Sequence, residues 1–85
     1  MPAILRFGPY RFLFYSVDRG EPIHVHVERD DFEAKFWLKP IRLAYADGFS
    51  KIEIRRIERI ISKHHGELTN GWNKYFNPGS RNDEH

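Results

Sequence analysis

Three polar residues alternate with apolar ones in the segment PIHVHVE, residues 22–28. Successive side chains of a strand point to opposite faces, so His24, His26 and Glu28 share one face and the apolar residues share the other. Imidazole and carboxylate groups are ligands of divalent transition metals, and histidine is a common general acid or base near neutral pH. One interpretation is therefore a metal or catalytic site at these three residues, in a small metal-dependent nuclease or hydrolase.

The same face has a second interpretation, as a solvated or partner-binding surface. Another β-forming run follows after two aspartates, which predicts a hairpin with a two-residue turn. Such a hairpin places His24 opposite Trp37 and His26 opposite Lys35. These four residues form the predicted partner-binding surface.

A basic stripe marks the predicted C-terminal helix. Lysine and arginine recur at four-residue steps, on the side away from the apolar residues, with one further arginine beside them: Lys51, Arg55, Arg59, Lys63 and Arg56. Such a stripe can bind phosphates without sequence specificity, which gives non-specific nucleic-acid binding as a further hypothesis. The alternative is an ordinary solvated helix face. Ile52 lies near this stripe and is predicted to be an exposed apolar contact.

Four β-forming runs must position the histidines: residues 3–7, 10–16, 23–29 and 32–38. Gly8-Pro9 predicts the turn of the first hairpin, and Asp30-Asp31 the turn of the second. The second hairpin pairs Glu28 with Glu33, a repulsion that a longer loop or a bulge would remove. Residues 39–50 are expected to be a connector with a short helical turn.

The predicted helix begins at Ser50, because Ser50 and Glu53 have the spacing of a capping box. One apolar stripe then runs along it: Ile54, Ile57, Ile61, His64, Leu68, Trp72 and Tyr75. His64 is therefore expected at the core or its edge. The prediction is one long helix with a weak joint near Gly66, and two shorter helices are the alternative.

The predicted fold is α+β: a four-stranded, mostly antiparallel sheet of two hairpins, packed on one face by the long C-terminal helix. The 85 residues make one domain, 1–76, followed by a disordered tail, 77–85. A formal charge of +2 does not by itself imply nucleic acid. Nothing in the sequence sets the oligomeric state.

Composition removes several classes of site. The chain has no cysteine, which excludes disulfides, thiolate nucleophiles and cysteine-ligated zinc. No cofactor is predicted apart from the divalent metal considered above. A signal peptide is not visible, and no apolar run approaches the roughly 20 residues of a membrane span. We therefore expect a soluble, cytoplasmic protein.

The segments MPAILRFGPYRFLFYS, EPIHVHVERDDFEAKFWL, GFSKIEIRRIERII and WNKYF together resemble the domain-of-unknown-function 4160 family of small bacterial proteins. The resemblance extends from Met1 to about Phe76. The family hallmark looks like Pro-Pro-His-Val-His-Val before an acidic residue, and here Ile23 replaces the second proline. A second departure is the glycine-containing stretch HHGELTNGW, where a smoother helix would be expected.

The resemblance implies no established activity. Members are often encoded beside another small protein, which has prompted the suggestion of toxin–antitoxin-like pairs. The leading hypothesis is therefore a protein-binding member of such a two-protein module, with the nuclease or hydrolase and the nucleic-acid-binding protein as alternatives.

Overall fold

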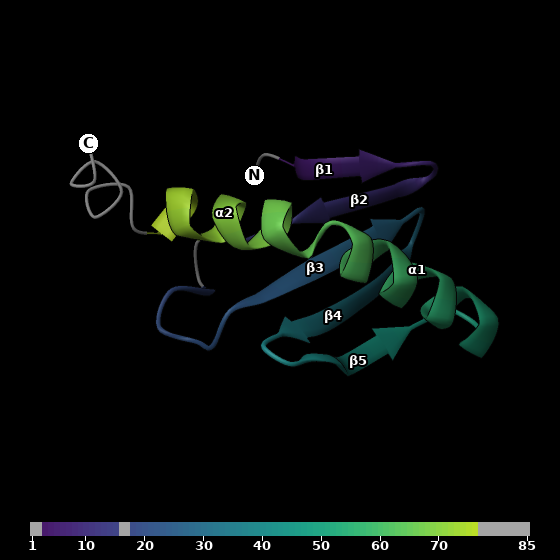
Figure 1. Ribbon diagram of the computed structural model, residues 1–85. Coiled ribbons are helices and arrows are strands. Elements are labelled where there is room, and N and C mark those ends of the chain that lie inside the picture. Colours follow the sequence, from purple (N-terminus) through teal and green to yellow (C-terminus); the bar gives the residue numbers. More distant parts are fainter. Residues whose placement is uncertain (1–2, 16–17, 77–85) are drawn as a thin grey trace.

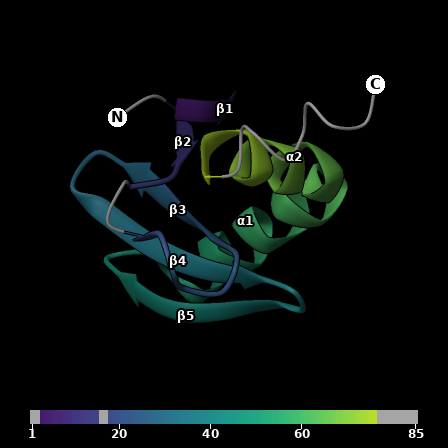
Figure 2. The ribbon, with the colours of Figure 1, turned by 90° about the vertical axis from the view of Figure 1, so that its left-hand side faces the viewer.

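The computed structural model describes residues 3–15 and 18–76, and the side chains from Leu5 onward within these ranges. The predicted tail, 77–85, lies outside the described residues. Five strands form one antiparallel sheet in sequence order: β1 Ala3–Phe7, β2 Tyr10–Leu13, β3 His24–Arg29, β4 Phe32–Leu38 and β5 Ile41–Asp47. Two helices, α1 Lys51–Lys63 and α2 His65–Phe76, run across one face of this sheet (Figures 1 and 2). The α+β class is confirmed.

Both predicted hairpins are present, and the register of the second is confirmed. Gly8 and Asp30 occupy the turns with positive φ angles of 58° and 54°, a region that glycine and aspartate tolerate. Strand β3 pairs with β4 so that His24 faces Trp37 and His26 faces Lys35. The hairpin has no bulge, so Glu28 lies directly opposite Glu33. Each carboxylate accepts hydrogen bonds from other side chains, and these bonds offset the repulsion.

The prediction of four strands was wrong, because part of the expected connector is strand β5. This strand pairs along β4 with one irregularity, between Lys35 and Phe36 of β4. Its residues are exposed except for the partly buried Ile41. Burial therefore does not alternate along this strand, and the alternation that predicts a strand from sequence is missing. The alanines and Pro40 within IRLAYAD and its approach also weaken the β signal.

The prediction of one long helix with a weak joint near Gly66 was also wrong, and the alternative of two helices is correct. The break lies at His64, with φ −111° and ψ 24°, whereas Gly66 lies inside the first turn of α2. The N-terminus of α1 is as predicted, since Ser50 Oγ accepts a hydrogen bond from Glu53 N–H at 3.1 Å. His65 Nε2 lies 2.6 Å from the Leu38 carbonyl oxygen and so ties the start of α2 to the end of β4.

The core lies between the sheet and the two helices. The largest fully buried apolar side chains come from both layers: Phe12, Val25, Val27, Phe36, Leu38, Ile57, Ile61 and Leu68. Burying each such side chain contributes about 1.5–3 kcal/mol, which explains why the helices dock on this face. Gly48, with a φ of 101°, makes the turn into α1, and a Cβ there would collide with the Phe32 ring. Neither helix of the described chain has the length and apolar character that a membrane span requires.

Candidate functional site

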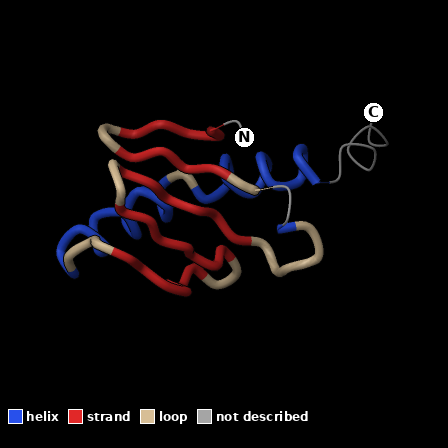
Figure 3. Tube along the Cα trace, turned by 180° about the vertical axis from the view of Figure 1, so that it is seen from behind, coloured by secondary structure: helices blue, strands red, loops and turns tan. Residues whose placement is uncertain are grey.

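Figure 3 shows the sheet face that the helices leave uncovered. His24 and His26 alternate along β3 with two valines of the core, so they point to this other face, but they are not on the surface. His24 is 0 % and His26 4 % exposed, so the expectation of a solvated histidine face was wrong. The His26 ring stacks against Tyr15 with centroids 4.2 Å apart. His24, where β3 begins, contacts Trp37 and also Trp72 of α2, at 5.5 and 5.0 Å.

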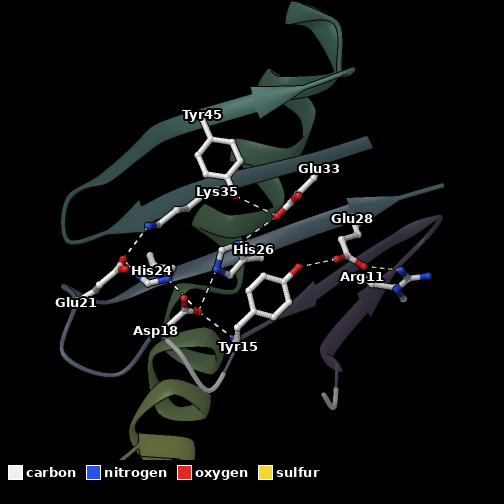
Figure 4. Close-up of polar contacts among 10 residues, drawn as sticks. All are labelled: Arg11, Tyr15, Asp18, Glu21, His24, His26, Glu28, Glu33, Lys35 and Tyr45. Carbon is white, nitrogen blue, oxygen red and sulfur yellow. Dashed lines mark hydrogen bonds and ion pairs between the residues drawn. The ribbon is translucent and has the colours of Figure 1, made fainter. Parts of the chain in front are cut away.

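A buried aspartate joins the histidines, and together these three residues form what we name the histidine cluster: Asp18, His24 and His26 (Figure 4). One oxygen of Asp18, Oδ2, lies 3.0 Å from His26 Nε2 and 3.1 Å from His24 Nε2. The same oxygen accepts the Tyr15 backbone N–H at 2.9 Å, and Asp18 N–H donates to the Tyr15 carbonyl at 2.9 Å. The carboxylate thus fixes the loop between β2 and β3 over the histidines.

Asp18 was missed by the sequence analysis. The segment SVDRGEP has the composition of a loop, and an aspartate in a loop is ordinarily a solvated turn residue. Its role follows only from the way this loop returns the chain onto β3, which no local pattern encodes.

Glu28, the third residue proposed from the alternation, lies outside the cluster. Its carboxylate accepts hydrogen bonds from Arg11 at 2.5 Å and from the Tyr15 hydroxyl at 2.7 Å. These two bonds hold the pKa of Glu28 below its usual value of 4.5, and burial with the bond to Glu28 raises the pKa of Tyr15. Glu28 is therefore a saturated structural anion, which also explains how it tolerates its position opposite Glu33.

The hydrogen bonds of the two rings fix part of their protonation. His24 Nδ1 lies 2.8 Å from the Pro22 carbonyl oxygen, and a carbonyl only accepts, so this nitrogen carries a proton. Burial lowers the pKa of His26, although Asp18 acts in the opposite direction. Two buried nitrogens, His24 Nε2 and His26 Nδ1, have no hydrogen-bond partner among residues 3–15 and 18–76.

Lys35 and Trp37, the other predicted partner-binding residues, border the cluster and contact residues of their own chain. Lys35 Nζ forms an ion pair with Glu21 at 2.8 Å and lies 4.6 Å from the centroid of the Trp37 ring. The neighbouring Tyr45 hydroxyl donates to Glu33 at 3.1 Å, and burial together with this bond raises the pKa of Tyr45 to about 12. The structure thus brings the predicted surface together around a closed, internally bonded network.

The opposite situation holds on α1. All five predicted nucleic-acid-binding residues are exposed, and we name them, together with Ile52, the α1 face: Lys51, Ile52, Arg55, Arg56, Arg59 and Lys63. Within residues 3–15 and 18–76, none of the five cations has an ion-pair partner. Arg56 alone lies close enough to Tyr10 and Glu53 to affect their pKa values. Ile52 is 72 % exposed, as predicted from its place near the basic stripe.

A groove runs along each side of the α1 face. The groove toward the β1–β2 turn, of about 310 Å³, is lined by Phe7, Gly8, Pro9, Tyr10, Arg56, Arg59, Ile60 and Lys63. The groove toward β5, of about 420 Å³, is lined by Leu43, Ala46, Phe49, Lys51, Ile54, Arg55 and Glu58. Each groove therefore combines apolar side chains with basic residues of the α1 face.

The two regions can perform different chemistry. The histidine cluster has ligand atoms but almost no exposed surface, so a substrate has no contact with its rings in this conformation. The α1 face is accessible, charged and partly apolar, as a binding surface requires. His64, expected at the core edge, is half-buried and forms an ion pair with Glu67 at 3.1 Å.

Comparison with known proteins places the chain in a family. No curated protein and no solved structure matches it. The model of one family, described as Domain of unknown function (DUF4160), matches residues 10–73 of the 85. This range includes the histidine cluster and the whole α1 face, and it is shorter than the Met1 to Phe76 resemblance seen in the sequence. The chain therefore belongs to the DUF4160 family.

Proposed function

We propose that this protein is a binding module that associates with an acidic protein partner through the α1 face. One observation carries the proposal: the exposed side of α1 combines five cations without ion-pair partners in the described chain with an isoleucine that is 72 % exposed. Protein interfaces are enriched in arginine and in apolar side chains at their centre, and charge complementarity selects the partner.

The arrangement of charge on α1 supports a role outside folding. Lys51, Arg55, Arg59 and Lys63 follow one another at i, i+4. Like charges at this spacing destabilise a helix by about 0.2–0.5 kcal/mol for each pair. A partner with carboxylates opposite the α1 face would remove this repulsion.

The surface differs from the one that the sequence suggested for a partner. His24 and His26 are covered by Tyr15, Trp37 and Trp72, so a partner would meet them only after the loop had moved. The α1 face and its two grooves need no such rearrangement. The resemblance to proteins encoded beside another small protein supports a protein partner, in a pair of toxin–antitoxin type.

Non-specific nucleic-acid binding through the same five cations is the second candidate, because an exposed row of lysine and arginine also fits phosphates. Apolar grooves and an exposed isoleucine contribute nothing to phosphate contacts, and they favour protein. The metal-dependent nuclease or hydrolase has less support, since its proposed histidines have almost no exposed surface.

The proposal is tested with an acidic protein that co-purifies with the chain as the probe; the resemblance suggests looking for it among small proteins encoded nearby. The double variant Arg55→Glu, Arg59→Glu should weaken binding about 100-fold or more, because each central arginine contributes about 1–2 kcal/mol or more to an interface. Arg42→Glu is the matched control: Arg42 is exposed, and it pairs with Trp37 on the opposite face of the sheet. If both variants bind as the wild type does, the α1 face is not the contact surface.

A second substitution separates protein from nucleic acid. Ile52→Lys adds a charge to the α1 face and removes its exposed apolar side chain. It should weaken binding of the protein partner, and it should strengthen binding of a random-sequence RNA oligonucleotide if phosphates are the true ligand. Stronger RNA binding with a steeper salt dependence, and unchanged binding of the protein, would favour the second candidate.

A further inference from the structure

We infer that the histidine cluster is a site for one divalent transition-metal ion, held by Asp18 Oδ2, His24 Nε2 and His26 Nε2. This inference is independent of the proposed binding function. It replaces Glu28, the ligand suggested by the alternation, with an aspartate from the preceding loop.

The spacing of the three atoms fits a common coordination shell. The distances from Asp18 Oδ2 to the two Nε2 atoms are 3.0 and 3.1 Å, and all three ligand atoms lie within 4.8 Å of one another. Ligands at about 2.0–2.1 Å from a tetrahedral zinc ion are about 3.3 Å apart. Two imidazoles and a carboxylate without thiolate suit zinc, iron, cobalt or nickel better than calcium or magnesium.

The protonation of His24 favours an ion over a simple hydrogen bond. Because its Nδ1 donates to the Pro22 carbonyl, the Nε2 of the neutral ring has a lone pair that faces the Asp18 carboxylate. Two acceptors 3.1 Å apart repel each other unless a proton or a metal ion lies between them, and in the described chain the geometry of this pair is not that of a hydrogen bond. A metal-binding histidine characteristically donates its second N–H to a backbone carbonyl, as His24 does here.

His26 is placed to bind the same ion. Coordination through Nε2 requires the ring proton on Nδ1, and Nδ1 lies 3.6 Å from Glu33 Oε2. The proton then moves from Nε2 to Nδ1 of one neutral ring, and Glu33 accepts the new N–H. The Tyr45 hydroxyl already holds this glutamate in place. Glu33 would then hydrogen-bond the ring of His26 while that ring binds the metal, an arrangement that orients metal-binding histidines in many proteins.

One ion therefore accounts for both buried nitrogens that have no hydrogen-bond partner. His24 Nε2 would bind the metal, and His26 Nδ1 would donate to Glu33. Three protein ligands leave at least one coordination position for water or another small ligand. The ion would join the β2–β3 loop to β3, so that it would stabilise the folded chain.

Zinc alone, added to the full chain after treatment with a chelator, is the probe. We expect one bound ion per chain, a higher melting temperature, and changes in the ring ¹⁵N resonances of His24 and His26 by NMR. Asp18→Asn, which keeps an oxygen for the Tyr15 N–H, should abolish the rise in melting temperature. Glu33→Gln should weaken zinc binding about 10- to 100-fold. His64→Gln, at a half-buried histidine outside the cluster, is the control and should bind as the wild type does.

The wild-type NMR experiment needs no variant, so a poorly folded Asp18→Asn protein leaves the test intact. Ring resonances of His24 and His26 that do not respond to zinc would overturn the inference. So would a zinc response that Asp18→Asn retains in full, because the ion would then bind elsewhere.

Discussion

The two sides of this molecule use charged and polar residues in opposite ways. On one side, Asp18 and the histidines are buried, and their neighbours Glu28 and Lys35 are bonded to other side chains of the same chain. On the other side, the α1 face exposes five cations that have no ion-pair partner in the described chain. Both regions show a regular polar pattern in the sequence: alternation in β3 and a four-residue repeat of cations in α1.

The difference shows that spacing predicts which residues share a face, and not whether that face is covered. The histidine face is closed by the β2–β3 loop, which directly precedes β3, and by a tryptophan from α2, which is distant in sequence from β3. In the part of the chain that the structure describes, the residues of the α1 face remain exposed. Contacts with other parts of the chain therefore decide which polar residues have a structural role and which remain available for binding.

The largest expected effect compares two histidines. His24→Ala should lower the free energy of unfolding by about 3 kcal/mol, because it leaves a cavity between two tryptophans and removes a partner of the buried Asp18. His64→Ala, at the core edge, should cost less than about 1 kcal/mol. Urea unfolding of both variants with a chelator present measures the difference, and equal losses would contradict the account of the closed side.

An intermediate effect is expected at Glu53 in the first turn of α1, because Glu53, like the residues around the histidines, is bonded to side chains of its own chain. Glu53 accepts hydrogen bonds from Arg29 at 2.7 and 2.9 Å and from the Tyr10 hydroxyl at 2.9 Å. Glu53→Gln should cost about 1–2 kcal/mol at pH 7.

The pH dependence of stability provides the check for Glu53. The bonds to Arg29 and Tyr10 lower the pKa of Glu53 in the folded chain below 4.5. Its contribution is therefore complete above pH 4.5 and is lost as the pH falls through the lowered pKa. The variant should lose less stability than the wild type between pH 5 and pH 2, and parallel curves would show that the carboxylate contributes nothing.

These expectations also separate what the sequence predicts well from what it does not. Both hairpins, the register of β3 on β4, the cap at Ser50 and the exposure of Ile52 follow from local spacing and turn chemistry. Such features depend on residues that are close together in the chain.

The errors arose where distant contacts decide the outcome. Strand β5 is stabilised by pairing with β4, and its mostly exposed residues show no burial pattern. The helix ends at His64, two residues before the glycine that suggested a joint. The burial of His24 and His26 depends on Asp18 and Trp72, which no spacing rule connects with them.

The smallest expected effect is on the open side and has the opposite sign. Replacing Arg55 and Arg59 with glutamine removes all three like-charge i, i+4 pairs along α1, so the free energy of unfolding should rise by about 0.6–1.5 kcal/mol at low salt. The gain should disappear at high salt, where the repulsion is screened. A loss of stability at low salt would mean that these arginines have stabilising partners in the folded chain.

The central claim is that the partner contacts the α1 face and leaves the histidine cluster covered. Its most direct test is NMR mapping of the ¹⁵N-labelled chain during titration with the proposed partner, an acidic protein identified by co-purification with the chain. We predict that the backbone resonances of Ile52, Arg55 and Arg59 shift, while those of His24, His26 and Lys35 stay in place. Shifts concentrated at the histidines and Lys35, with α1 unaffected, would contradict the claim and return the binding surface to the opposite face of the sheet.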